Sequence, residues 1–418
     1  PDNEVGTHLV THPGVDMVML TGSIETAEMF QSWKPSMHLN AETSGKNAMV
    51  ITAAADIDQA IKELVKSAFG HAGQKCSAAS LAIIEGSVYD DPTFHIRLAD
   101  AVRSLPVGEA TDFNNIVGPV INPPTGNLLR ALTTLEPGEA WLVEPIKINE
   151  TTFTPGVRKD VKPNSWFHLN ECFGPVLGLM RASDLTHAVQ LQNATQYGLT
   201  GGIQSLDPKE IDFWLANVQV GNAYVNRHIT GAIVERQPFG GWKKSSIGPG
   251  QKPGGPNHLS GYGNWTEQGI NIDSALADYR YQWNNYFTHE HDPTGLKSEA
   301  NILRYFPVDK VYVRCSNPTA PEIDLMRAAS AITGVPLEIS VRSDESEAAL
   351  GNRMQHAIGE SRLRILAPAT DELLSLAHAA GITVDTAPVT GSGRLELTHW
   401  LKEQAISRTM HRYGRLLN

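Results

Sequence analysis

Two residues in this sequence have settings that could support covalent chemistry. Cys76 follows a glycine-containing turn, FGHAGQKC, next to an expected helix start. Backbone N–H groups and the neighbouring Lys75 would favour its thiolate, the nucleophilic form. Glu42 stands at the end of an expected strand, where a carboxylate could face a cleft and act as general base. A lone cysteine is also often a buried apolar residue, and a lone glutamate a surface charge, so position alone leaves both interpretations open.

The remaining cysteines and the histidines indicate no further chemistry. Cys172 and Cys315 lie in apolar surroundings, and we expect both in the core. His71 and Cys76 are a pair without further ligands at a suitable spacing, so no metal site is expected. Three cysteines in 418 residues exclude a disulfide scaffold and favour a reducing, intracellular compartment.

A segment rich in glycine and proline, PFGGWKKSSIGPGQKPGGPNHLSGYG, begins at Pro238. Such a segment cannot form a regular helix or a central strand. It is either a linker or an ordered loop that binds a ligand through backbone amides.

The composition excludes several classes of function. Hydrophobic residues make up 41% of the chain, and 34 basic against 45 acidic residues give a net charge of −11. A protein of this charge without a dense Lys/Arg run is not expected to bind nucleic acid electrostatically. No apolar stretch approaches the ~18–20 residues of a membrane helix, and the N-terminus has no signal-peptide pattern.

Apolar runs and helical periodicity alternate along the chain, which predicts an α/β fold with parallel sheets. The first β-α-β unit is expected at 15–21, 24–33 and 37–41, followed by a helix at 57–69. A second, smaller, Rossmann-like sheet is expected from about residue 301. Its predicted strands are 310–314, 337–341, 363–366 and 382–386, and its predicted helices are 320–333, 345–358 and 370–380. No G-x-G-x-x-G follows its first strand, so we expect no dinucleotide there.

Five motifs, in order along residues 4–262, resemble those of the aldehyde dehydrogenase superfamily. They are LTGS from Leu20, ETSGKN from Glu42, FGHAGQKC ending at Cys76, ECFGPV from Glu171 and PFGG from Pro238. Each is weak alone, but five in the same order make a chance match negligible. The cysteine motif, the long loop and the end of the chain resemble most the aldehyde dehydrogenase half and C-terminal domain of the bifunctional bacterial proline utilization A proteins.

The resemblance implies an aldehyde dehydrogenase-like fold and a division into five segments. These are the C-terminal part of an NAD-binding domain (1–44), a catalytic domain (45–237), a substrate-anchoring loop and return segment (238–262), a bridge (263–300), and a non-catalytic C-terminal α/β domain with a docking tail (301–418). We expect that last domain to act as a lid or scaffold.

The resemblance also implies roles for single residues. Cys76 would attack the aldehyde carbon of L-glutamate γ-semialdehyde, and Glu42 would activate the water that hydrolyses the resulting thioester. The residues expected to bind NAD are Gly22, Ser23, Glu171 and Phe173. The residues expected to bind the substrate are Ser77, Ser245, Ser246, Gly248, Gly250 and Gly254. The sequence does not distinguish NAD from NADP.

The family's oxyanion-hole asparagine and adenosine-contacting lysine would precede Pro1. We therefore expect a C-terminal fragment that is inactive, or nearly so, alone. The expected partners are an upstream proline dehydrogenase domain, which would hold FAD, and further copies in a homo-oligomer. The expected location is the bacterial cytoplasm, with any membrane association arising through the larger protein. The alternatives are a dehydrogenase for another aldehyde and an interaction module with a vestigial site.

Overall fold

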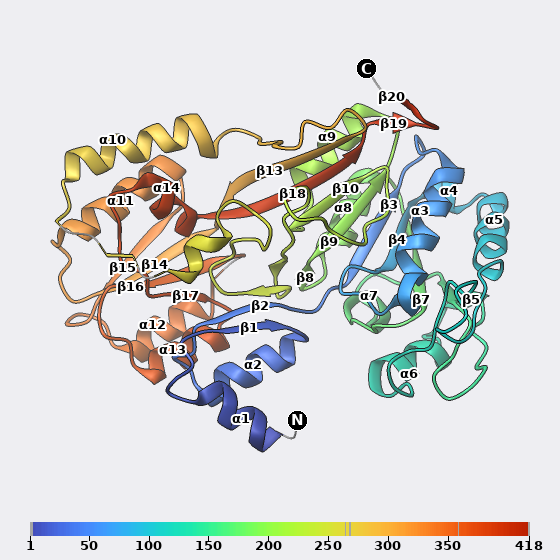
Figure 1. Cartoon of the computed structure of the whole chain (residues 1–418), viewed down its shortest axis with the longest axis horizontal. Helices are drawn as coiled ribbons and strands as arrows, with labels where there is room; N and C mark the ends of the chain where they lie inside the picture. The colour runs from blue at the N-terminus through green and yellow to red at the C-terminus, as the bar shows by residue number, and fades with distance from the viewer. Residues whose placement is uncertain (1–2, 264, 267–268, 358, 417–418) are drawn as a thin grey trace. The chain divides into compact units, whose positions relative to one another are not determined.

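The computed structural model describes residues 3–263, 265–266, 269–357 and 359–416, which divide into two compact α/β units (Figure 1). The first unit comprises Pro1–Thr43, Gln237–Pro293 and Ile302–Ala405. The second comprises Ser44–Arg236, Thr294–Asn301 and Ile406–Asn418. Segments far apart in the sequence therefore fold together in each unit.

The first unit begins with a small sheet that carries Glu42. Its N-terminal elements are α1 (Asn3–Thr11), β1 (Val18–Thr21), α2 (Ile24–Trp33) and β2 (Leu39–Glu42). The strands β1 and β2 are parallel, and β12 (Ser246–Ile247) adds to β2 in antiparallel orientation. Ala27, Leu39 and Ala41 are fully or almost fully buried between helix and sheet. The predicted β-α-β order is confirmed.

The larger sheet of the first unit is the predicted Rossmann-like one. Its four parallel strands run in the order β15 (Leu337–Val341), β14 (Lys310–Cys315), β16 (Ser361–Ile365) and β17 (Thr383–Asp385). The connecting helices are α11 (Pro321–Thr333), α12 (Glu347–Met354) and α13 (Asp371–Ala379). All seven elements were predicted from the sequence, because each apolar strand and each helical stripe buries its residues in this unit's core.

The segment expected as a bridge contains a helix. It is α10 (Ile272–Gln282), which continues into a π-helical turn, η3 (Trp283–Phe287). Tyr279 of α10 is fully buried and its hydroxyl donates to the Thr390 carbonyl, close to α14 (Gly393–Glu396) and η4 (Leu397–Trp400). Ala275, Tyr279 and Phe287 of this segment therefore belong to the core of the first unit.

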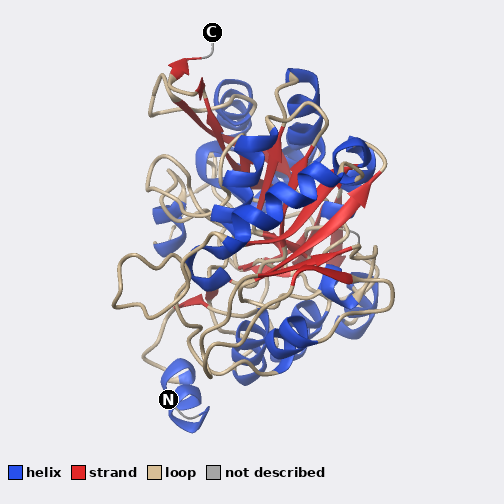
Figure 2. Cartoon of the chain, turned by 90° about the vertical axis from the view of Figure 1, so that its right-hand side faces the viewer, coloured by secondary structure: helices blue, strands red, loops and turns tan. Residues whose placement is uncertain are grey.

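The second unit is built on a long sheet, and Cys76 lies just before the start of its strand β4 (Ala79–Glu85). The order of its strands is β10 (Asn222–Val225), β9 (Thr200–Gln204), β3 (Asn47–Ile51), β4 (Ala79–Glu85), β7 (Val176–Ala182), β6 (Gly156–Lys159) and β5 (Ala140–Val143). All are parallel to their neighbours except β5. Helices α3 (Ile57–Phe69) and α8 (Leu185–Asn193) pack on its central strands, and Figure 2 shows helices lying over strands.

Two long strands beyond β10 were not predicted. They are β18 (Leu401–Thr409) and β13 (Glu299–Pro307). Their sequences, LKEQAISRT and EANILRYFP, mix charged and apolar residues without alternation, so nothing in the pattern indicated a strand. Residues Ile406–Thr409 and Glu299–Asn301 of these strands belong to the second unit.

The chain's end forms a short hairpin within the second unit. The hairpin strands β19 (His411–Arg412) and β20 (Arg415–Leu416) pair antiparallel. Arg412 and the Tyr413 hydroxyl both donate to Asp56 Oδ2, at 2.8 and 2.7 Å, and Asp56 caps the N-terminus of α3. Leu417 and Asn418, the last two residues of the expected tail, lie outside the described residues.

The remaining elements are short or peripheral. They are η1 (Gly70–Gly73), α4 (Gly86–Tyr89), α5 (Pro92–Arg103), α6 (Gly126–Thr133), α7 (Trp166–Leu169), β8 (Tyr197–Gly198), α9 (Pro208–Asn217), β11 (Trp242–Lys243) and η2 (His258–Tyr262). In the part of the chain that the structure describes, no helix combines the length and apolar character needed to cross a membrane.

Candidate active site

A strained turn between α3 and β4 presents Cys76. His71, Ala72 and Gly73 have φ values of +56°, +53° and +67°, so three successive residues are left-handed, a conformation that non-glycine residues adopt at a cost. The turn reverses the chain at the end of α3, and Cys76 is left partly exposed. Cys172 and Cys315 are buried, as expected.

Asn47, at the start of β3, fixes the backbone around the cysteine. Its Nδ2 donates to the carbonyls of Cys76 and Ala78 at 2.7 and 3.0 Å, and its Oδ1 accepts the Thr200 N–H at 3.0 Å. Gly45 packs so closely that a Cβ there would lie 2.7 Å from the Cys76 carbonyl oxygen. The motif ETSGKN therefore does more than carry Glu42: its Gly45 and Asn47 hold the backbone around Cys76.

The expected nicotinamide-side motif lies beside the cysteine turn. Gln74 Nε2 donates to the Phe173 carbonyl at 3.1 Å, and the Gly45 N–H donates to Glu171 Oε1 at 2.9 Å. Phe173 itself has φ +52° and its side chain is 39% exposed. The fold thus brings Glu171, Phe173 and Cys76 into one cluster, although their sequence positions are far apart.

Gly73 packs closely against Gly174, and this approach predicts a sharp effect of substitution. A Cβ on Gly73 would lie 2.2 Å from the Gly174 carbonyl oxygen, and φ is positive there. We expect Gly73→Ala to lower the free energy of unfolding by about 1–3 kcal/mol, because the backbone must shift. Gly70→Ala is the matched control, because Gly70 has φ −55° and open space around it. Equal denaturation midpoints for the two variants would contradict this account.

Glu42 is half-buried in a polar setting of the first unit. Its Oε2 accepts the Gly241 N–H at 3.0 Å, and Gly240 packs against its Oε1. Burial raises the pKa of Glu42 to about 7, while the positive charge of Lys252 and the Gly241 N–H act in the opposite direction. A carboxyl with such a pKa is half-ionised near neutrality, which suits a general base.

Lys252 is a site residue that the sequence analysis missed. Its side chain is almost fully buried, and its ammonium donates to the Gly240 carbonyl. Burial lowers the pKa of Lys252 to about 8, although Glu42 and Glu403 favour its charged form. A lysine inside a Gly/Pro-rich run carries no sequence signal of burial, so only its tertiary surroundings identify it.

The glycine-rich loop (residues 238–262) is ordered, and its two serines lie against Glu42's strand. Ser245 is fully buried, and its carbonyl accepts the Thr43 N–H at 3.0 Å. Ser246 pairs with Glu42 in the β12–β2 ladder. The linker interpretation is therefore excluded for this part of the loop.

The glycines of the same loop serve close backbone packing and turns. Gly248 has φ +111°, and a Cβ there would lie 2.7 Å from the Leu39 carbonyl oxygen. Gly250 and Gly254 are also left-handed, with φ +82° and +77°. Ser77, the other expected substrate contact, is buried in the second unit, where its carbonyl accepts the Thr200 hydroxyl at 3.3 Å.

Of the residues expected at the cofactor, Gly22 and Ser23 lie in the first unit and Phe173 lies in the second. Gly22 and Ser23 form the turn between a parallel strand and a helix N-terminus, with Ser23 Oγ accepting the Thr26 N–H at 3.3 Å. Such a turn is a general binding place for phosphate. In the second unit, the exposed Phe173 ring could pack on a flat heteroaromatic ring.

Comparison with known proteins assigns the family. The sequence profile of the aldehyde dehydrogenase family matches residues 1–267. The chain belongs to the aldehyde dehydrogenase family. The expected fold class is thereby confirmed, and the motifs around Glu42, Cys76 and Glu171 all lie within the matched residues.

Individual relatives within this family narrow the comparison. The 1-pyrroline-5-carboxylate dehydrogenase of Geobacillus sp. is 36% identical over 267 residues, which are 61% of this chain and 51% of that protein. A Thermus 1-pyrroline-5-carboxylate dehydrogenase solved with bound NAD is 31% identical, with a TM-score of 0.56, over 62% of this chain and 51% of that one. The chain thus spans about half the length of these relatives.

One solved structure matches along the whole chain. Proline utilization A from Corynebacterium freiburgense is 43% identical with a TM-score of 0.91, covering 100% of this chain and 44% of that one. The match includes the Rossmann-like sheet that follows the aldehyde dehydrogenase part. The resemblance expected from the loop and the chain's end is confirmed.

Proposed function

We propose that the full natural protein oxidises L-glutamate γ-semialdehyde to L-glutamate, with NAD as hydride acceptor. One observation carries the substrate assignment: the similarity to proline utilization A extends over the whole chain, C-terminal domain included. Relatives named 1-pyrroline-5-carboxylate dehydrogenase support the same chemistry over the first 267 residues or so. The semialdehyde is the open form of that pyrroline.

Cys76 is the proposed nucleophile. Its thiolate adds to the aldehyde carbon, and the carbonyl oxygen becomes an alkoxide that the Cys76 backbone N–H helps to stabilise. When bound, the nicotinamide of NAD supplies the acceptor for the hydride that leaves this carbon. A thioester on Cys76 remains.

Glu42 is the proposed general base for the second half of the reaction. Its carboxylate takes a proton from water, the hydroxide adds to the thioester carbonyl, and the carbon–sulfur bond breaks. Glutamate leaves and the Cys76 thiolate is restored. The pKa of about 7 lets Glu42 accept this proton and release it again near neutral pH.

The remaining site residues are proposed in supporting roles. Gly22 and Ser23 bind the dinucleotide phosphates, Glu171 the ribose hydroxyls, and Phe173 packs on the nicotinamide. Ser77 and the loop residues Ser245, Ser246, Gly248, Gly250 and Gly254 bind the α-carboxylate and ammonium of the substrate. An upstream proline dehydrogenase domain with FAD, and a homo-oligomeric assembly, are proposed for the full protein.

The pKa of Glu42 predicts the pH dependence of turnover. Burial raises this pKa to about 7, so below that pH most molecules carry a protonated Glu42 that cannot accept a proton. Under conditions where hydrolysis limits turnover, kcat should rise with pH and level off above about 7. Glu42→Gln should remove this limb and lower kcat by ~10²–10⁴-fold. A flat profile between pH 5.5 and 8.5 in the unsubstituted protein would contradict the assignment.

The function is tested by following NADH formation from L-glutamate γ-semialdehyde in the full natural polypeptide. Parallel assays use NADP in place of NAD, and glyceraldehyde 3-phosphate and lactaldehyde in place of the semialdehyde. A kcat/KM for the semialdehyde at least tenfold above the other aldehydes is expected. A preference for another aldehyde would retain the family chemistry and overturn the substrate.

A further inference from the structure

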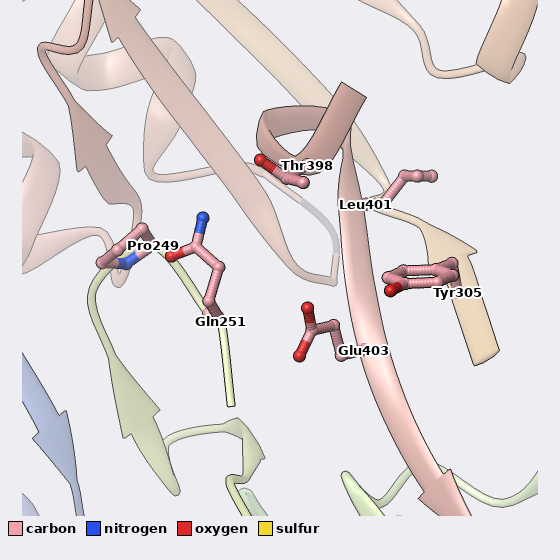
Figure 3. Close-up of a pocket in the computed structure, with 7 residues that line it drawn as sticks. Pro249, Gln251, Tyr305, Thr398, Leu401 and Glu403 are labelled. Atoms are coloured by element: carbon pink, nitrogen blue, oxygen red, sulfur yellow. The ribbon is translucent and has the colours of Figure 1, made fainter. Parts of the chain in front are cut away.

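A single buried glutamate of the C-terminal domain holds the glycine-rich loop at three points. Glu403 lies on β18 and is 4% exposed. Figure 3 shows its carboxylate directed toward the loop segment that carries Gln251. One carboxylate oxygen accepts the Lys252 backbone N–H at 2.9 Å, and the other accepts Asn257 Nδ2 at 2.6 Å. Its carbonyl accepts the indole N–H of Trp242 at 2.7 Å.

The neighbouring groups close this cluster. Tyr305, on β13, takes a second hydrogen bond from the Asn257 amide at 3.0 Å. Tyr305 and Glu403 line a small pocket together with Pro249, Gly250, Gln251, Thr398 and Leu401 (Figure 3). Each carboxylate oxygen of Glu403 thus accepts a hydrogen bond from the loop.

The middle of the three points, Lys252, connects this cluster to Glu42. Gly240 separates the two side chains: a Cβ on Gly240 would lie 2.8 Å from Glu42 Oε1 and 3.2 Å from Lys252 Cγ. The Lys252 ammonium donates to the Gly240 carbonyl, and the next N–H, that of Gly241, donates to Glu42. Hydrogen bonds within the first unit therefore connect Glu403 to Lys252, and connect Lys252 to Glu42 through the Gly240–Gly241 backbone.

Charge couples the members of this chain. The charged groups that act on Lys252 are Glu42, Glu403 and Glu360, all carboxylates. Burial raises the pKa of Glu403, while the N–H donors of Asn257 and Lys252 and the positive charges of Lys252 and Arg394 favour its ionised form. The buried guanidinium of Arg362 also interacts with Glu403. Since burial opposes the charged form of Lys252, each carboxylate helps to retain its proton, and the retained charge in turn favours ionised Glu42.

We propose that Glu403 is a positioning residue for the general base: it holds Lys252 beside Glu42 and keeps that ammonium charged. The C-terminal domain would then act on aldehyde oxidation through one side chain, without touching substrate. The kinetic test of this inference rests on the proposed function, whereas the infrared tests do not.

The direct test titrates Glu42 without using activity. Infrared difference spectra between acid and neutral pH report the carboxyl C=O band of protonated Glu42, which Glu42→Gln identifies by its loss. Glu403→Gln removes the negative charge that favours protonated Lys252. A smaller fraction of the molecules then carries a charged Lys252 beside Glu42. We expect the Glu42 midpoint to rise by about one pH unit. An unchanged midpoint would overturn the proposal.

A double-mutant cycle tests whether Glu403 acts through Lys252. Lys252→Met should raise the Glu42 midpoint by at least as much as Glu403→Gln does. The double variant should show no further rise, because the shared intermediary is gone. Additive shifts would show that Glu403 acts on Glu42 by another route, which contradicts the proposal.

A matched control separates positioning from general destabilisation. Glu396 is another fully buried glutamate of the same domain, bonded to Arg364, and it is not among the groups acting on Lys252. Glu396→Gln should lower thermal stability and leave the Glu42 midpoint in place. A midpoint shift in this variant equal to that of Glu403→Gln would mean that Glu403 is merely structural.

Kinetics of the full natural polypeptide complete the test. In Glu403→Gln, the acid limb of the profile of kcat against pH should move to higher pH, by the same amount as the infrared midpoint of Glu42. A matching infrared shift in a protein that does not oxidise the semialdehyde would retain the positioning role and reject the proposed substrate. An infrared shift without any movement of the kcat limb in an active protein would reject the role in catalysis.

Discussion

Cys76→Ala is expected to abolish aldehyde oxidation, lowering kcat/KM on the order of 10⁴-fold or more. The reason is chemical: without sulfur at this position no thiohemiacetal forms, and hydride has no tetrahedral carbon to leave. The backbone that holds residue 76 should persist, because Asn47 binds its carbonyl and not its side chain. NADH formation in the full natural polypeptide is the measurement.

The other two cysteines are the controls for this substitution. Cys172 and Cys315 are buried, and burial raises the pKa of each thiol, so neither is a ready nucleophile. Cys172→Ala and Cys315→Ala should keep kcat/KM within a few fold. Retained oxidation in Cys76→Ala, or its loss in both controls, would refute the assignment of the nucleophile.

Arg364→Met is expected to lower the stability of the first unit by about 3–5 kcal/mol. Arg364, on β16, is fully buried, with Nη1 2.9 Å from Glu396 Oε1 and Nε 3.3 Å from Asp385 Oδ2. It also donates to the Ala387 carbonyl at 3.1 Å. Methionine fills much of the volume but leaves two buried carboxylates without their shared cation. Denaturant unfolding of the chain measures the loss.

The pH dependence of this loss follows from Asp385. Although burial raises its pKa, Arg364 and His399 hold the pKa of Asp385 far below its ordinary value of 3.8. A depressed carboxyl pKa contributes stability above the unfolded-state pKa and loses it as pH falls. The difference between Arg364→Met and the unsubstituted chain should therefore be largest at neutral pH and shrink below about pH 4.

A surface arginine of the same domain provides the comparison. Arg327 pairs with Asp324 at 3.0 Å within α11, and both side chains are about half exposed. Arg327→Met should change the unfolding free energy by no more than about 0.5 kcal/mol. Similar losses for Arg364→Met and Arg327→Met would refute the view that burial makes the difference.

Most elements that position the site were predictable because their apolar residues recur at the spacing of one kind of secondary structure. The stripe Ile61, Leu64, Val65 and Ala68 predicted α3, and the structure buries those residues against the sheet. The apolar run before Cys315 predicted β14 for the same reason. The candidate nucleophile and base were predictable because each lies at the end of such an element, within a motif that resembles the family's.

The strands β13 and β18 could not be predicted, because their residues are buried by partners distant in sequence. Glu403 and Gln404 read as surface residues along the chain, yet both are almost fully buried. Arg362 and Arg364 alternate on β16, where a solvent-facing pattern would be expected, but both guanidiniums are bound inside the domain. Burial of a charge depends on its counter-charges, which the local sequence does not contain.

The sequence by itself determined the family, the order of most helices and strands, and the identities of Cys76 and Glu42 as candidates. Local periodicity and motif order suffice for these, since both are properties of neighbouring residues. The tertiary structure alone decided that Lys252 is buried beside Glu42 and that Glu403 binds its backbone. The bond between Lys252 and Glu403 joins residues 151 positions apart, and the pKa effects arise from the desolvation that folding imposes.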